Sequence, residues 1–170
     1  AAVKAGAALG VPEARTQIWL YRIPSLIGAT ATVLLTYWAL LAFLSPPLAL
    51  LGGALMATAV LLGVEARIAK TDAVLAACAV ASMGALARTW LDWTRSLAFV
   101  PSRRSWLVFW VATAIGLLIK GPIVPMVWGL AILVLSASQR SFRWLRPLRF
   151  GPGLLLCLIV VLPWFVAIMI

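Results

Sequence analysis

Histidine is absent from this chain of 170 residues, and acidic residues are scarce. The lack of histidine excludes histidine-based acid–base catalysis and histidine-ligated zinc within the chain. Charged residues make up only 11% of the sequence, with four Asp and Glu residues against fourteen Lys and Arg residues. So few polar side chains do not cover a soluble domain of this length. Cysteine is also rare: Cys78 and Cys157 each lie in an apolar run, where we expect isolated small apolar side chains.

Apolar residues, in contrast, make up 65% of the chain. Several runs approach the roughly 20 residues that span a bilayer, which predicts an all-α, polytopic transmembrane helical bundle. We favour full spans for the two short runs on either side of Gly121-Pro122, with a re-entrant hairpin as the alternative. After an interfacial segment at 1–22, the predicted spans are about 23–43, 48–64, 73–87, 105–119, 123–138 and 153–170.

The basic residues flank these apolar runs and form no continuous basic face. Membrane topology therefore explains the net charge of +10 better than nucleic-acid binding does. The loops 88–104 and 139–150 carry eight of the fourteen basic residues, so the positive-inside rule places both in the cytoplasm. The segments 1–22 and 65–72, together with Lys120, then face outward. We expect a multi-pass protein of a bacterial plasma (inner) membrane.

A compact cluster of both charge signs joins the second and third predicted spans. It contains Glu65, Arg67, Lys70 and Asp72. Charges at such a joint are candidates for chemistry, and a phosphate or carboxylate between Arg67 and Lys70 would relieve their mutual repulsion. The alternative roles are structural: interface anchoring for the two cations and helix N-terminal capping for Asp72. Composition alone favours these structural roles.

Lys120 offers a second charged tip, in the stretch LLIKGPIVP. Its side chain either snorkels to the membrane interface or points a cation at a phosphate. Asp72 and Lys120 fall on the same side of the predicted topology. Two hairpins would therefore each deliver a charge to one surface, and we predict that Asp72 approaches Lys120 in the folded protein.

Four short motifs in order carry a resemblance to a known family. They are YRIPSLIGATATVLLTY, EARIAKTDAVLAA, GLLIKGPIVP and LPWFV. Each is individually weak, but their order and separation resemble the membrane core of the ArnT/PMT-like glycosyltransferases, which have the GT-C fold. The resemblance covers essentially the whole chain. It differs mildly at Ile119, where the family commonly has Thr before the lysine.

The resemblance implies an enzyme that moves a sugar from a polyprenyl-phosphate donor to a lipid or protein acceptor at the outer membrane face. The matching positions are Arg22, Pro24 and Ser25 in the first motif, Arg67 and Asp72 in the second, and Lys120 and Gly121 in the third. Together with the charged joint between the second and third spans, these positions lead us to assign donor phosphate binding to Arg67, Lys70 and Lys120. We assign cavity lining to Glu65, Asp72 and Gly121.

The resemblance also implies that the catalytic carboxylate and any divalent-metal ligand lie upstream, in a first outer loop. The chain begins AAVKAG without Met and ends within an apolar run, so we expect an internal piece that is inactive alone. We assign no catalytic residue, metal ligand or cofactor to it. A membrane transporter and a structural membrane subunit are the alternatives, although the charges lie at span ends rather than at mid-membrane.

Overall fold

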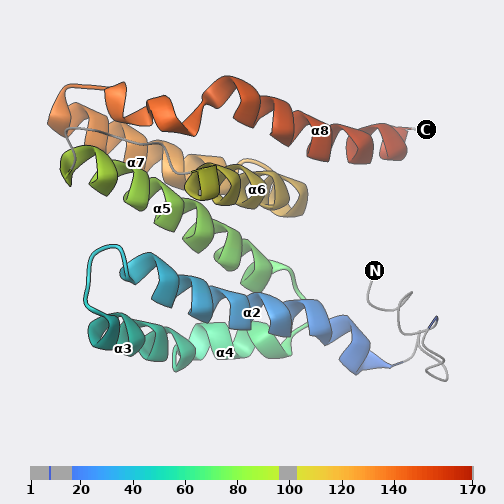
Figure 1. The fold of residues 1–170 in the computed structure, drawn as a ribbon. Coiled ribbons are helices and arrows are strands. Elements are labelled where there is room, and N and C mark those ends of the chain that lie inside the picture. Colours follow the sequence, from blue (N-terminus) through green and yellow to red (C-terminus); the bar gives the residue numbers. More distant parts are fainter. Residues whose placement is uncertain (1–7, 9–16, 96–102, 170) are drawn as a thin grey trace.

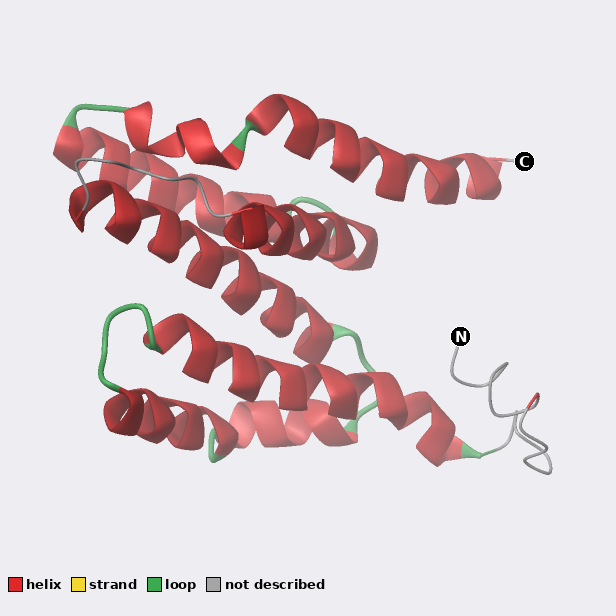
Figure 2. Ribbon diagram, in the orientation of Figure 1, coloured by secondary structure: helices red, strands yellow, loops and turns green. Residues whose placement is uncertain are grey.

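The computed structural model describes residue 8 and residues 17–95 and 103–169, and these form helices joined by short connections (Figures 1 and 2). Most of the predicted interfacial segment 1–22 lies outside the described residues. In chain order the elements are α2 (Ile18–Leu40), α3 (Pro46–Ala57), α4 (Val60–Arg67), α5 (Asp72–Arg95), α6 (Arg103–Lys120), α7 (Ile123–Gln139), the 3₁₀ helix η1 (Arg143–Leu148) and α8 (Phe150–Met169). The all-α membrane bundle predicted from the sequence is confirmed.

Among the described residues, three helices are long and apolar enough to cross a membrane: α2, α5 and residues 150–167 of α8. The pair α3 and α4 adds a fourth if it is counted as one bent span. Helix α7 is apolar but shorter, and α6 has a charged residue at each end. Large apolar side chains are exposed along these helices, as expected for surfaces that face lipid. The count of about six spans stays a prediction.

The second predicted span, 48–64, is not one helix. Helix α3 ends at Ala57, α4 begins at Val60, and the two are bent by 56° across the break. At the break, the Thr58 hydroxyl donates a hydrogen bond to the Leu55 carbonyl at 3.0 Å. A hydroxyl that bonds back to its own helix competes with the regular backbone pattern and favours a bend. Within the described residues, the bent helix pair, which is either a broken span or a re-entrant loop, is therefore α3 and α4.

Two further boundaries differ from the sequence prediction. The predicted loop 88–104 is helical over residues 88–95, because α5 continues to Arg95 with Trp90 and Trp93 packed against the core. Helix α2 already begins at Ile18 and ends at Leu40, since the consecutive prolines after Ser45 start a new helix.

Helices α2 and α5 run parallel and pack closely along their length (Figure 1). Gly28 permits this approach, because a Cβ atom there would lie 2.6 Å from the backbone nitrogen of Val74. At the far end, the Arg88 guanidinium stacks 4.5 Å above the Trp38 ring and donates a hydrogen bond to the Trp38 carbonyl at 2.5 Å. The two helices are therefore in contact from the start of α5 to its last two turns.

The main core lies between α5, α6, α7, η1 and α8. It is built around the fully buried rings of Phe109, Trp110 and Trp144. Cys78 and Cys157 are both free and buried, as the sequence predicted. This aromatic core fixes α6 against its neighbours and so fixes the position of Lys120 at the end of that helix.

Candidate functional site

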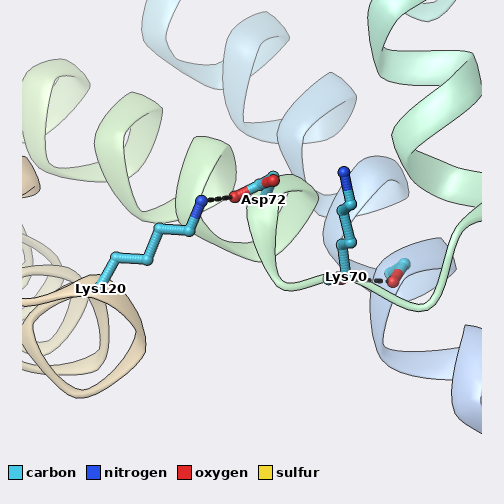
Figure 3. A network of polar contacts seen from close by, with 4 residues as sticks. Lys70, Asp72 and Lys120 are labelled. Carbon is cyan, nitrogen blue, oxygen red and sulfur yellow. Dashed lines mark hydrogen bonds and ion pairs between the residues drawn. The ribbon is translucent and has the colours of Figure 1, made fainter.

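The predicted meeting of two hairpin tips is present in the structure. Asp72 is the first residue of α5 and Lys120 is the last residue of α6. The Lys120 ammonium and the Asp72 carboxylate form an ion pair, which Figure 3 shows bridging the two helices. The prediction that Asp72 approaches Lys120 is therefore confirmed. Both side chains keep partial exposure, 31% for Asp72 and 43% for Lys120, so a ligand can reach the pair.

The turn after α6 places Lys120 at the tip. Gly121 has a backbone φ of +67°, in the left-handed region that glycine adopts without steric penalty. Its N–H donates a hydrogen bond to the Leu117 carbonyl at 2.9 Å, which closes the last turn of α6. The chain then enters α7 at once, so Lys120 stands at a sharp reversal. Gly121 in the sequence motif is thus the residue that makes the tip.

The start of α5 is held by hydroxyl groups on α2. Ser25 donates a hydrogen bond to the Lys70 carbonyl at 2.5 Å. Thr32 shares its hydroxyl hydrogen between the Gly28 carbonyl of its own helix, at 2.8 Å, and the Ala73 carbonyl, at 3.1 Å. Both hydroxyl side chains are buried, where an unmade hydrogen bond is expensive. These two bonds fix the backbone on both sides of Asp72. The sequence analysis named Ser25 only as a motif position and predicted no role for its hydroxyl. It did not identify Thr32.

A cavity of about 380 Å³ lies beside this backbone, between α3, α4 and α5. Its walls are apolar apart from two carboxylates, those of Glu65 and Asp72. The Glu65 Oε2 atom is buried and has no hydrogen-bond partner among the described residues. A buried acceptor without a donor is unfavourable, so this oxygen is poised to accept a hydrogen bond from a bound group. Glu65 and Asp72 thus line one cavity. Whether it is the donor cavity that the family resemblance implies stays a prediction.

The remaining predicted residues lie around this centre. Arg67 ends α4 and is exposed, and Lys70 is exposed in the linker to α5. Figure 3 shows Lys70 extending from the linker while Lys120 reaches Asp72. Helix α4 ends at Arg67, so Arg67 and Lys70 do not share a helix. Their spacing of three residues therefore does not place them on one helix face. Their role in phosphate binding stays a prediction, as does cavity lining by Gly121.

Metal binding has limited support in this part of the chain. Within residues 17–95 and 103–169, no three side chains of the ligating types gather at one place. Asp72 is also engaged by a lysine, which competes with a cation for the same carboxylate.

Comparison with protein families identifies the chain. The model of the dolichyl-phosphate-mannose-protein mannosyltransferase family matches residues 8–166. The chain belongs to this family. Comparison with curated proteins gives no match, and comparison with solved structures gives none either.

Family membership settles the class of protein. The mannosyltransferase family contains membrane glycosyltransferases of the GT-C type, which use lipid-linked sugar donors and protein or lipid acceptors. The match covers α2 to α8, and so includes both hairpin tips and the cavity. Transporter and structural-subunit alternatives are thereby set aside in favour of a glycosyltransferase.

Proposed function

We propose that the tips of α5 and α6 bind the phosphate of a polyprenyl-phosphate sugar donor at the outer face of a bacterial plasma membrane. In the whole enzyme, the sugar would pass to a lipid or protein acceptor. The observation that carries the proposal is the Lys120–Asp72 ion pair beside a cavity lined by Glu65, whose buried Oε2 has no hydrogen-bond partner among the described residues.

The chemistry needs a cation at this position. When the sugar leaves, the bond between its anomeric carbon and the phosphate oxygen breaks, and negative charge develops on the phosphate. A fixed cation in a water-poor site stabilises that charge more than water does. Asp72 positions the Lys120 ammonium without enclosing it, because both side chains remain partly exposed. Arg67 and Lys70 would add further positive charge at the same end of the bundle.

The cavity supplies a place for the sugar. Its volume of about 380 Å³ falls within the range of roughly 300 to 1,000 Å³ that is common for small-molecule sites. Glu65 would accept a hydrogen bond from a sugar hydroxyl through its unpartnered oxygen. The base that accepts the acceptor's proton is not among the residues assigned here.

Binding of a polyprenyl phosphate tests the proposal. The natural protein, expressed at its full length, would be titrated with a polyprenyl phosphate and, separately, with the corresponding polyprenol. We expect tighter binding of the phosphate, and loss of that preference in Lys120→Ala. Arg95→Ala is the matched control, because it removes one exposed cation from the opposite end of α5. An unchanged phosphate preference in Lys120→Ala, or equal loss in both variants, would rule out this site.

A further inference from the structure

The connection between α7 and α8 carries arginine at every third position. The residues are Arg140, Arg143, Arg146 and Arg149, and all four are exposed. The middle of the connection is η1, a 3₁₀ helix with three residues per turn, in which side chains three apart eclipse one another. Arg143 and Arg146 therefore lie on one side of η1. The rise of about 2.0 Å per residue separates them by about 6 Å along its axis.

The opposite side of η1 is anchored in the core. Trp144 and Leu148 are fully buried. The Trp144 indole donates a hydrogen bond to the Ser136 hydroxyl at 3.2 Å, and the Leu148 carbonyl accepts one from the Trp110 indole at 2.7 Å. The backbone that carries the two arginines is thus held near both of its ends. A ligand that binds them has little backbone to order, which lowers the entropic cost of binding.

No ion pair involves these arginines within the described part of the chain. The ion pair found there, Lys120–Asp72, lies at the other end of the α6–α7 hairpin. Two guanidinium groups about one turn apart repel unless an anion lies between them. Guanidinium groups match phosphate oxygens with paired hydrogen bonds, so phosphate is the anion that this spacing favours.

The neighbouring surface indicates a lipid as the source of that phosphate. Phe142 directly precedes Arg143, and 63% of its side chain is exposed. Helix α8, which follows, is a candidate membrane span, and only 11% of the residues in that span are buried within the protein. An apolar ring beside paired cations, next to a lipid-facing helix, suits the boundary between headgroups and acyl chains. An acidic protein partner would explain the arginines but not the adjacent exposed ring.

We propose that Arg143 and Arg146 form a binding site for the phosphate of an anionic phospholipid, with Phe142 inserted among its acyl chains. This site is separate from the donor site, which lies at the opposite end of the hairpin. It also differs from a general preference for basic residues on one side of the membrane. Such a preference depends on the number of charges, whereas the proposed site depends on two particular arginines held in register.

The test compares two pairs of arginines that carry equal charge. The natural protein in lipid nanodiscs would be titrated with phosphatidylglycerol against a phosphatidylcholine background, and binding measured by native mass spectrometry. In Arg143→Gln/Arg146→Gln we expect phosphatidylglycerol to bind about thirty-fold more weakly, since each arginine would lose a hydrogen bond to the lipid phosphate that is worth about fivefold. The control Arg103→Gln/Arg104→Gln removes two exposed arginines that are adjacent in α6 and so do not share a face. It should stay within a fewfold of the parent.

Three results would overturn the proposal. Equal weakening in both pairs would show a general field rather than a site. If the parent protein binds phosphatidylglycerol and phosphatidylcholine equally, an anionic phospholipid is not the ligand. Binding of polyglutamate in place of phosphatidylglycerol would assign the arginines to an acidic protein.

If the glutamine pair does not fold, Arg143→Lys/Arg146→Lys keeps the charge and loses the paired geometry. We expect about fivefold weaker binding from it, the equivalent of one lost hydrogen bond, and parent affinity would refute the site.

Discussion

Replacing Lys120 with alanine should separate a functional role for this residue from a structural one. If Lys120 stabilises the charge that develops on the donor phosphate, its loss resembles the loss of one oxyanion-hole donor. Such losses cost about 3 to 4 kcal/mol of transition-state stabilisation, a factor of about 10² to 10³ in turnover. Lys120→Arg should retain part of the activity, because it keeps the charge with a different donor geometry.

The structure sets a much smaller limit on stability. The Lys120–Asp72 pair has side chains that are 43% and 31% exposed, so solvent screens it. Ion pairs of this kind contribute at most about 1 kcal/mol to the free energy of unfolding. Lys120→Ala should therefore change thermal stability little while it reduces turnover strongly. The experiment therefore compares the loss of turnover with the change in thermal stability.

The assay is sugar transfer from a polyprenyl-phosphate donor by the natural protein at full length, measured beside thermal unfolding. Asp72→Asn and the double variant complete a double-mutant cycle. Asp72→Asn keeps the capping ability of the side chain and loses its charge, so it should displace Lys120 and reduce turnover less than Lys120→Ala does. Parent turnover in both single variants would show that the two residues only anchor helices at the interface. A loss of turnover matched by an equal loss of stability would also refute the phosphate role.

Three further predictions concern the frame and its orientation. Ser25→Ala should lower the free energy of unfolding by about 1 kcal/mol, because it removes one part-buried hydrogen bond to the Lys70 carbonyl; an unchanged midpoint in a denaturant titration would refute this. Gly28→Ala should cost about 1 to 3 kcal/mol by forcing α2 away from α5, whereas the exposed Gly151→Ala, which meets open space, should be nearly neutral. A cysteine at Thr71 should react with an impermeant reagent in intact cells and one at Ser141 should not; the reverse pattern would invert the proposed topology.

The sequence predicted the contact between Asp72 and Lys120 for a simple reason. Hairpin tips that alternate across a membrane return to the same surface, and the charges sat at the ends of apolar runs. The tip geometry was also readable, because Gly121-Pro122 after a lysine is a strong signal for a sharp reversal. Local chemistry was sufficient for both conclusions.

Other features depend on packing that a single sequence does not display. The break between α3 and α4 occurs at Thr58-Ala59, without the glycine or proline that usually marks a bend. Helix α5 continues beyond its apolar run because Trp90 and Trp93 pack against the core. The polar residues that begin at Arg88 had instead predicted a loop. The bond from Ser25 to the Lys70 carbonyl spans 45 positions of sequence, so only the folded arrangement reveals it.

The attachment of α2 to α5 at both ends has a consequence for how this protein tolerates change. The hydrogen bond from Ser25 to Lys70 holds one end of the α2–α5 pair, and the contact between Arg88 and Trp38 holds the other. Helices α3 and α4 lie between α2 and α5 in the sequence, so they connect two helices that are already held together. Insertions or deletions within 46–67 should therefore leave the register of Asp72 unaltered. They would move Glu65 instead, and with it one wall of the cavity. The shape of the cavity could then change in evolution without moving the carboxylate of Asp72.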